Sequence, residues 1–404
     1  MTFLLALLRS LEAGTGSSRE TATRHEKLIA SAGRVSNDVP KKKSRHSSYF
    51  GGRMMGCGAA VLLASAAGAS VFDIRSDART ATGVPTNSAS FGATVAGDMD
   101  TIEAAIERAR PGDTVTIPAG TYQISRLVVA PNTILYAPQG ATIIGDMIVR
   151  GPKTVIRGFT FAAGTVDISN SQSVTIGGCA FDGGTTAIKL DGASDALIIN
   201  NDFHAVTGDV ITGSGLDRSM ISGNHFVDCG QCINLDFNDD TARGRDIVIE
   251  RNIFTGTTRM PLEVGPLGAY TENLVVRDNW AEDFKNRGPD PGATALTFVA
   301  YSIVPTRGVN TIIKGNYAIA GRRGRGAIGI ELDGSGEIAG NYIQDFNYGA
   351  VVYGAGFNVH ENAFVDARQG PVLNYAKRSG RIAGNSTGDQ IPKIARPERR
   401  TWSP

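Results

Sequence analysis

Carboxylate side chains recur at matching places in several short apolar segments of this sequence. Glu263 lies in PLEVG, Glu331 in GIELDG and Asp236 in CINLDF. Two carboxyl groups held several ångströms apart can act as general acid and general base, the arrangement with which many enzymes cleave glycosidic bonds. These three acids are far apart in the sequence, so such chemistry requires a fold that places their segments side by side.

An internal repeat supplies segments that can be placed in this way. The pattern apolar-x-apolar-x-Asn-x-aromatic recurs with asparagine at residues 201, 224, 252, 279, 316, 341, 362 and 385. A second alternating segment, such as AIKLDG or PLEVG, follows each copy. We therefore expect each unit to form two short strands separated by Gly, Asn and Asp turns. One unit cannot bury its apolar face alone, so the units are expected to stack with their strands paired in parallel.

The composition agrees with stacked turns. The 50 glycines suit turns that need a positive φ. Asparagines in one column are expected to hydrogen-bond their equivalents one coil away, with Gly158 and Gly178 in the same column of earlier units. An aromatic column is expected to stack in or beside the core; its members are Phe181, Phe203, Phe226, Phe254, Tyr317, Tyr342 and Phe364.

The stretch DTIEAAIERARPGDTVTIPAGTY, residues 100–122, reads as a helix followed by a strand. Ile102, Ala105, Ile106 and Ala109 form an apolar stripe that could cover the open end of a stack. With this motif and the repeat, residues 98–388 resemble right-handed parallel β-helix proteins of the pectate-lyase-like superfamily. The resemblance implies an all-β solenoid of roughly 10 coils with an N-terminal capping α-helix. Because this scaffold carries lyases, hydrolases, epimerases and non-enzymatic surface proteins, it does not decide the activity.

The first part of the chain differs from the repeat in composition. Residues 1–90 are expected to be a mostly disordered leader. Within it, basic residues precede MMGCGAAVLLASAAGA (54–69), a segment typical of a signal peptide. This predicts a secreted or periplasmic protein, with translation starting near Val39 or Met54; a disordered linker is the alternative. A membrane anchor is disfavoured because the segment is short and rich in Gly and Ala.

Charge and domain organisation limit the partners. The net charge of +1 disfavours nucleic acid and anionic membranes as ligands. We expect a β-helix domain over residues 98–388, a C-terminal tail over 389–404, and a monomer or small oligomer.

Aligned second strands predict rows of side chains, because equivalent residues of neighbouring coils lie ~4.8 Å apart. The first predicted row is Lys189, Ile211, Asn234, Glu263, Thr297, Glu331 and Val352. A second row, two positions on, is Asp191, Gly213, Asp236, Gly265, Val299, Asp333 and Gly354. Glu263 and Glu331 are then two coils, roughly 9.6 Å, apart, close to the ~6.5–9.5 Å of an inverting glycosidase pair. Glu263, Glu331 and Asp236 are therefore the predicted catalytic residues.

Other side chains on or beside this face are candidate substrate ligands. Basic groups suit a uronic acid polymer and tyrosines offer surfaces on which sugars stack. The predicted substrate-binding residues are Lys189, Asn234, Arg243, Arg259, Tyr301, Asp333 and Tyr353. Long loops leave the same strand edge, where binding residues usually lie.

The stretch CGQCINLDFNDD, residues 229–240, raises two further possibilities. Cys229 and Cys232 are not followed by a helix, which disfavours a redox dithiol, and too few ligands lie near by for zinc. Buried thiols are favoured, with a disulfide or metal site left open. Asp236, Asp239 and Asp240 could bind calcium, which several lyases of the superfamily use, although a solvated turn is the simpler interpretation.

The leading hypothesis is an exported polysaccharide lyase or glycoside hydrolase that acts on an acidic or neutral glycan. A non-catalytic glycan-binding or cell-surface β-helix protein is the alternative, and a virus-derived depolymerase is a third. The Gly-His-Gly and Arg-Ile-Lys motifs of polygalacturonases and the Asp-Pro-His-Asp motif of alginate epimerases are absent. No family activity is therefore assigned residue by residue.

Overall fold

The computed structural model describes residues 88–89, 102, 104–106, 109, 111–235, 243–264, 270–285, 297–301, 308–321, 326–354, 356–376, 380–388 and 394–398. The expected leader therefore lies outside the described residues, apart from β1 (Ser88–Ala89). Its signal-like segment, 54–69, stays a prediction. In the described part of the chain, no helix is long and apolar enough to cross a membrane.

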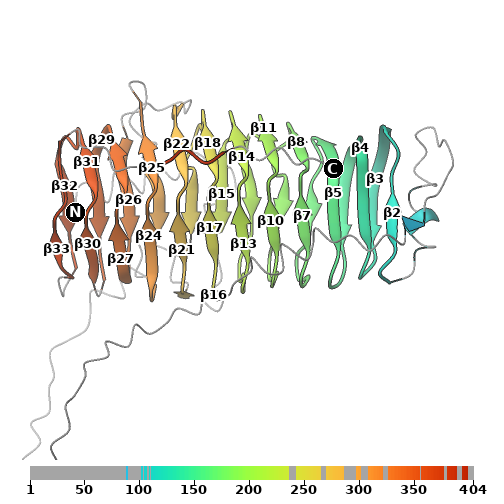
Figure 1. The fold of residues 1–404 in the computed structure, drawn as a ribbon, viewed down its shortest axis with the longest axis horizontal. Helices are drawn as coiled ribbons and strands as arrows, with labels where there is room; N and C mark the ends of the chain where they lie inside the picture. The colour runs from blue at the N-terminus through green and yellow to red at the C-terminus, as the bar shows by residue number, and fades with distance from the viewer. Residues whose placement is uncertain are drawn as a thin grey trace, which may run out of the picture. The chain divides into compact units, whose positions relative to one another are not determined.

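The described chain winds as a right-handed parallel β-solenoid of about 10 turns, as expected from the sequence (Figure 1). Strands of successive coils pair in parallel along the whole stack, from β2 at one end to β33 at the other. Most coils contain three strands, so the solenoid has three faces. We call them the first-, second- and third-strand faces, in the order in which the chain meets them.

The strand bounds follow this order. The first-strand face contains β2 (Thr114–Thr116), β4 (Ile134–Val149), β5 (Val155–Ala162), β7 (Thr175–Gly177), β10 (Leu197–Ile199), β13 (Met220–Ser222), β17 (Val248–Glu250), β21 (Val275–Arg277), β24 (Thr311–Lys314), β27 (Ser335–Ala339), β30 (Gly356–His360) and β33 (Ile382–Ala383). The second contains β3 (Gly120–Val129), β8 (Ala180–Asp182), β11 (Asp202–His204), β14 (His225–Val227), β18 (Ile253–Thr255), β22 (Trp280–Glu282), β25 (Tyr317–Ile319), β28 (Tyr342–Gln344) and β31 (Ala363–Val365). The long strands β3, β4 and β5 each continue round onto a neighbouring face.

The third-strand face contains β6 (Val166–Asp167), β9 (Ile188–Lys189), β12 (Asp209–Thr212), β15 (Gln231–Leu235), β19 (Leu262–Val264), β23 (Thr297–Tyr301), β26 (Gly326–Leu332), β29 (Phe346–Val352) and β32 (Gly370–Asn374). A separate two-stranded sheet pairs β16 (Arg243–Arg245) with β20 (Tyr270–Glu272).

The expectation of two strands per unit is wrong, because the repeat motif itself contains a corner. In one coil, β10 ends at Ile199 and β11 begins at Asp202. Asn200 between them has φ 53°, a left-handed conformation that turns the chain sharply. The predicted first strand is therefore two strands on two faces.

The asparagine column stacks as expected. Each side chain from Asn201 to Asn362 donates its Nδ2 to the Oδ1 of the asparagine one coil on, at 2.8–3.1 Å. Each Oδ1 also accepts from a main-chain N–H, as when Asn201 N donates to Asn224 Oδ1 at 3.0 Å. The buried amides thus find partners for both ends, which buried polar groups require.

The left-handed residue is not the asparagine but the residue before it, and this corrects the glycine assignment. Cys179 N donates to Asn201 Oδ1 at 3.0 Å, so Cys179 occupies the asparagine column. Gly178, with φ 61°, and Gly158, with φ 75°, occupy the preceding left-handed position. A glycine pays no Cβ penalty there, which explains its use.

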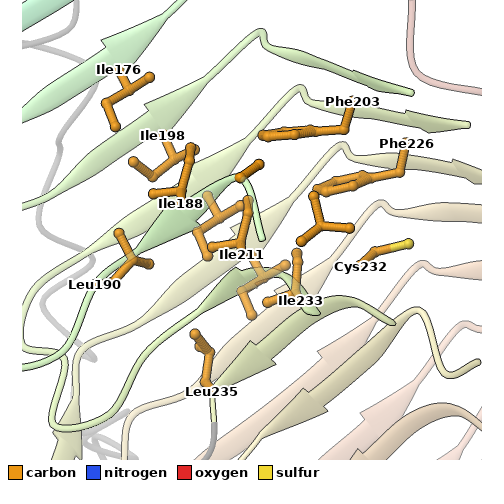
Figure 2. Close-up of a cluster of buried hydrophobic side chains, with 14 of the residues drawn as sticks. Ile176, Ile188, Leu190, Ile198, Phe203, Ile211, Phe226, Cys232, Ile233 and Leu235 are labelled. Atoms are coloured by element: carbon orange, nitrogen blue, oxygen red, sulfur yellow. The ribbon is translucent and has the colours of Figure 1, made fainter. Parts of the chain in front are cut away.

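The aromatic column divides into two stacks. Phe161, Phe181, Phe203, Phe226 and Phe254 stack inside the core with ring centroids 4.7–5.0 Å apart, and Figure 2 shows Phe203 and Phe226 beside core isoleucines. Phe254 then pairs with Ala281, which ends this stack.

Tyr317 and Tyr342 do not continue the core stack, contrary to expectation. They stack with Trp280, one position earlier in their strands, at centroid distances of 3.7 Å for Trp280–Tyr317 and 4.9 Å for Tyr317–Tyr342. A one-residue shift moves a side chain to the opposite face of a strand. This outer stack therefore faces away from the core.

A C-terminal segment packs on the outer aromatic stack. Ile394 packs against the cluster of Tyr342, Ala363 and Val365. The guanidinium of Arg396 lies 5.8 Å from the Trp280 ring centroid and donates to Glu282 at 2.8 Å. In Figure 1 the red C-terminal segment crosses the solenoid here.

The N-terminal end carries the expected apolar stripe. Ile102 and residues 104–106 are helical. Ile102 and Ile106 are buried in the core, and Ala105 and Ala109 pack against it. The stripe thus lies where a cap must lie to cover apolar side chains of the solenoid.

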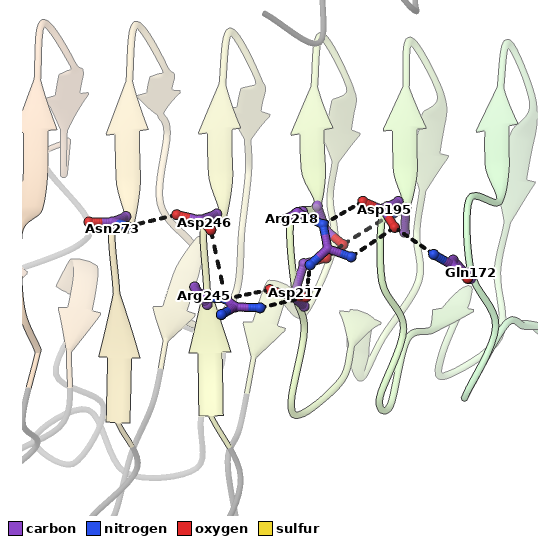
Figure 3. Close-up of polar contacts among 9 residues, drawn as sticks. Gln172, Asp195, Asp217, Arg218, Arg245, Asp246 and Asn273 are labelled. Carbon is purple, nitrogen blue, oxygen red and sulfur yellow. Dashed lines mark hydrogen bonds and ion pairs between the residues drawn. The ribbon is translucent and has the colours of Figure 1, made fainter. Parts of the chain in front are cut away.

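The corner between the third- and first-strand faces carries a ladder of charges (Figure 3). Arg218 donates to Asp195 at 2.8 and 3.0 Å, and Arg245 donates to Asp217 at 2.8 and 3.1 Å. Asn273 continues the ladder by donating to Asp246 at 2.7 Å. Partly exposed ion pairs of this kind each contribute little to the free energy of unfolding. We therefore interpret the ladder as helping to fix the register of neighbouring coils at this corner.

The asparagine stack predicts a position-dependent loss of stability. Asn252→Ala removes an amide that has partners on both sides, Asn224 and Asn279, and leaves their buried groups unsatisfied. We expect a loss of about 3–5 kcal/mol in the free energy of unfolding by urea denaturation. The matched variant Asn385→Ala, at the half-buried end of the stack, is expected to lose about 1 kcal/mol. Equal losses at both positions would contradict this account.

Candidate functional site

The predicted row of the third-strand face is largely confirmed, with a different register at three positions. The observed row is Lys189, Thr212, Asn234, Glu263, Ala300, Glu331 and Val351. Glu263 and Glu331 are two coils apart, with Ala300 at the register position between them. The two glutamates are therefore as far apart along the stack as the sequence predicted.

Three members of the predicted row are wrong. Ile211 lies in the buried inward row with Ile188 and Ile233, so Thr212 takes its place. Likewise Val351, not Val352, pairs with Glu331. Thr297 lies three residues before the true partner, Ala300, because the long insertion before β23 left the alignment there unconstrained.

The second predicted row is tested only in part. Val299 pairs with Leu262 and Ile330 in the inward row, so it does not lie beside Asp333 as expected. Asp333 and Gly354 are neighbours as predicted, since a Cβ on Gly354 would lie 2.3 Å from Asp333 Oδ1. Asp236 and Gly265 lie outside the described residues.

Glu331 has an unusual environment for an outward-facing carboxyl group. Glu331 is only 6% exposed and lies between the core residues Ile330 and Leu332 in the sequence. The hydroxyl of Tyr353 donates to Glu331 Oε1 at 3.1 Å. Burial raises the pKa of Glu331 to about 7; the Tyr353 hydrogen bond opposes this rise and the charge of Glu263 adds to it. A substantial fraction of Glu331 is therefore protonated at neutral pH.

Glu263 is half-buried and held in place by an amide. Gln231 Nε2 donates to Glu263 Oε2 across one coil. The negative charge of Glu263 also contributes, after burial, to the raised pKa of Glu331. The pair thus combines a carboxyl that holds its proton with a carboxyl fixed by a donor, which suits division into acid and base.

A second set of contacts extends the site by one coil. Asn234 Nδ2 donates to Asp209 Oδ2 at 3.0 Å, and Arg259 donates to Asp209 Oδ1 at 3.3 Å. Asn234 Oδ1 and Gln231 Oε1 are buried and have no hydrogen-bond partner among the described residues. Asn234 and Arg259 thus both contact Asp209 on this face, with Arg259 engaged by an acid, and their role in substrate binding stays a prediction.

The remaining predicted ligands are more scattered. Asp333 is buried near Tyr353. Burial and the charge of Glu331 raise the pKa of Tyr353 far above its usual value. Lys189 is exposed on the same row, three coils from Glu263. Tyr301 ends β23 opposite Val264, and its side chain lies outside the described residues.

Arg243 lies apart from the row. It is exposed in β16, in the separate sheet with β20 that leads into the charged corner. The structure therefore does not bring it together with Glu263 and Glu331.

Sequence reasoning missed two residues that contact the predicted row, Asp209 and Gln231. Asp209 opens its strand segment and Gln231 lies inside CGQC; neither belongs to the repeated column. Tyr375, 59% exposed, stacks on Tyr353 with ring centroids 5.3 Å apart at an interplanar angle of 8°. Only the three-dimensional register shows that Gln231 reaches Glu263.

The cysteines and the calcium hypothesis have different outcomes. Cys179, Cys229 and Cys232 are buried free thiols, as favoured, and burial raises the pKa of Cys229 to about 11. Among the residues that the structure describes, no group of three His, Cys, Asp or Glu side chains is placed to hold a metal ion. The calcium candidates Asp236, Asp239 and Asp240 lie outside those residues, so calcium remains a prediction.

The environment of Glu331 predicts a pH-dependent stability. Its folded-state pKa is above the value of about 4.3 in an unfolded chain, so stability falls as pH rises through about 7. Glu331→Gln has no carboxyl group to ionise, so it removes this loss. The difference in free energy of unfolding between this variant and the unmodified protein should therefore be about 3 kcal/mol more in favour of the variant at pH 9 than at pH 5. Urea denaturation at both pH values measures it, with the more exposed Glu337→Gln as control. A pH-independent difference would contradict the assigned pKa.

Comparisons with known proteins agree with the architecture. Residues 154–321 match the family model described as "Right handed beta helix region". No curated protein matches the sequence. The chain is similar to the tailspike protein of E. coli bacteriophage HK620 in complex with pentasaccharide, at 15% identity and a TM-score of 0.52, over 72% of this chain and 63% of that one. It thus spans less than two thirds of the tailspike chain.

A second similar structure is a mannuronic acid specific polysaccharide family 6 lyase from human gut microbiota. Identity is 16% and the TM-score is 0.52, over 72% of this chain and 79% of the lyase. At such identities the likeness concerns the fold alone. In fold, the chain is a right-handed parallel β-helix protein, as the sequence resemblance implied.

Proposed function

We propose that the protein is an inverting glycoside hydrolase whose polysaccharide substrate lies along the third-strand face. The observation that carries the proposal is Glu331, an outward-facing yet buried carboxyl with a pKa of about 7, two coils from Glu263. A general acid must hold its proton at working pH, and burial beside another acid is the usual means.

The two glutamates have distinct roles in this proposal. Protonated Glu331 gives its proton to the glycosidic oxygen as the bond to the anomeric carbon breaks. Glu263 takes a proton from the water whose oxygen forms the new bond to that carbon. The separation of two coils, roughly 9.6 Å between backbones, leaves room for this water, as in inverting enzymes. Gln231 positions Glu263, and Tyr353 adjusts the pKa of Glu331.

Hydrolysis fits the described side chains better than lyase chemistry. A lyase needs a base beside the sugar and a cation to neutralise its carboxylate. Arg259 is engaged by Asp209, and Lys189 lies three coils from Glu263. The oligosaccharide bound by the similar tailspike and the polysaccharide specificity of the similar lyase support a glycan ligand but do not choose the reaction.

Export to the periplasm or the medium is part of the proposal and rests on residues 54–69. The purified protein is to be incubated with a polysaccharide panel, with and without EDTA. New reducing ends without absorbance near 235 nm support hydrolysis, and that absorbance would indicate a lyase instead. Glycan binding without turnover would favour the non-catalytic alternative, and loss of activity with EDTA would support the calcium hypothesis.

The first activity prediction concerns the acids. Glu331→Gln and Glu263→Gln are each expected to lower kcat by about 10²–10⁴-fold, because each removes one proton transfer. Glu337→Gln, on the first-strand face, is the matched control and should retain activity. The anomer first released, followed by NMR, should be inverted. Retention of configuration, or full activity in either site variant, contradicts the assignment.

The proposed activity should also depend on pH through the protonation of Glu331. Activity should fall as pH rises through about 7, because Glu331 loses the proton that it must donate. Tyr353→Phe removes a hydrogen bond that favours the carboxylate, so the pKa of Glu331 rises and the alkaline limb of kcat/KM should move to higher pH. Tyr317→Phe, on the second-strand face, is the control. A limb that stays in place or moves to lower pH is incompatible with this role for Tyr353.

A further inference from the structure

Two buried amides beside the proposed catalytic pair have a common arrangement. Gln231 is fully buried and Asn234 is 9% exposed, both on β15. The nitrogen of each faces an acid: Gln231 Nε2 donates to Glu263, and Asn234 Nδ2 donates to Asp209 at 3.0 Å. Within the part of the chain that the structure describes, the carbonyl oxygen of each has no hydrogen-bond partner.

The chemistry of the neighbours decides which end of each amide is free. A carboxylate only accepts hydrogen bonds, so the atom that meets it must be the amide nitrogen. Asp209 also accepts from Arg259 at 3.3 Å, as a carboxylate does. Turning either amide over would place oxygen against oxygen. The two free atoms, Gln231 Oε1 and Asn234 Oδ1, are therefore both acceptors.

Buried acceptors without partners are rare in folded proteins, because each loses its hydrogen bonds to water without replacement. The asparagine stack of the same solenoid has the same kind of group and leaves its Oδ1 atoms satisfied. Among the described residues, the other buried side-chain atoms without a partner are threonine hydroxyls, and the two amides, both on β15, lie beside proposed catalytic Glu263. A ligand that donates hydrogen bonds would satisfy both.

We infer that β12, β15 and β19 form a subsite for a neutral sugar, whose hydroxyl groups donate to Gln231 and Asn234, and that this subsite disfavours a uronate. The inference deepens the proposed function and rests on it, because it names the substrate class of the same face. Register places the subsite one coil from Glu263, on the side away from Glu331. It therefore takes the sugar next to the cleaved bond when the glycan runs along the stack.

The two free acceptors support this substrate class. A uronate carboxylate only accepts hydrogen bonds, so it would meet Gln231 Oε1 and Asn234 Oδ1 as two further acceptors. A hydroxyl donates to the same atoms without added charge. Both free oxygens are shielded from solvent in the unliganded chain, so neighbouring side chains must move when the sugar enters.

Isothermal titration of the full chain carrying Glu331→Gln separates binding from turnover. The probes are hexasaccharides of glucose, mannose, galactose and N-acetylglucosamine, with hexagalacturonate and hexamannuronate as the acidic counterparts. We expect the best neutral probe to bind at least about 10-fold more tightly than either uronate. Gln231→Met and Asn234→Leu should each weaken that binding by about 10–100-fold. The matched control Gln344→Met, an amide on the second-strand face, should change it by less than about twofold.

The possible results divide cleanly. Tightest binding of a uronate, binding of none of the probes, or unchanged affinity in both folded amide variants overturns the inference. Should an amide variant fail to fold, as judged by its circular dichroism, the comparison of neutral with acidic probes still decides. A neutral preference lost in the amide variants, with no turnover by the unmodified protein, supports the subsite while hydrolysis fails. Turnover of a neutral glycan that both amide variants retain in full overturns the subsite alone.

Discussion

Hydrogen bonds between stacked asparagine amides hold the coils of the solenoid in register. Each amide donates to the next coil and accepts from a main-chain N–H, so a coil shifted by one residue would lose several buried hydrogen bonds at once. This fixes one register for the coils that carry the stack, from Cys179 to Asn385. The outward row with Glu263 and Glu331 is straight because the buried corner leaves it no alternative.

The same register separates the amides whose hydrogen bonds are all made from those that have an oxygen without a partner among the described residues. At the corner, identical side chains repeat and every donor meets an acceptor. On the third-strand face the row changes from Asn234 to Glu263 to Ala300, and the repetition that satisfies polar groups is broken. Departures from a repeat are therefore where this fold can acquire chemistry, since each leaves a group whose partner must come from elsewhere.

The stacking of the coils and the row that holds Glu263 and Glu331 could be predicted from the sequence, because equivalent positions of a repeat lie one coil apart. The asparagine spacing predicted the stack, and the apolar neighbours of Glu263 and Glu331 predicted their shared row. The corner inside each motif was missed because Asn200 and its equivalents turn the chain without a proline or an obligatory glycine. Tyr317 was misplaced by a single residue, which in a strand is a change of face.

The site was predictable only where it follows the repeat. Gln231 reaches Glu263 from the next coil, and Asp209 meets Asn234 in the same diagonal manner. No periodicity marks such contacts, because they join different columns. Tyr353, which follows β29, likewise donates a hydrogen bond to Glu331, twenty-two residues earlier.

The coil that carries Ala300 has a consequence for how such proteins can diversify. A solenoid tolerates the gain or loss of a whole repeat, because each repeat contacts only its neighbours. Loss of that one coil would bring the two glutamates to adjacent positions, about 4.8 Å apart, close to the ~5–5.5 Å of retaining glycosidases. The number of coils between the two carboxyl groups thus sets whether a reaction on this scaffold inverts or retains the configuration of the sugar. The duplication or deletion of a single coil is enough to change that outcome.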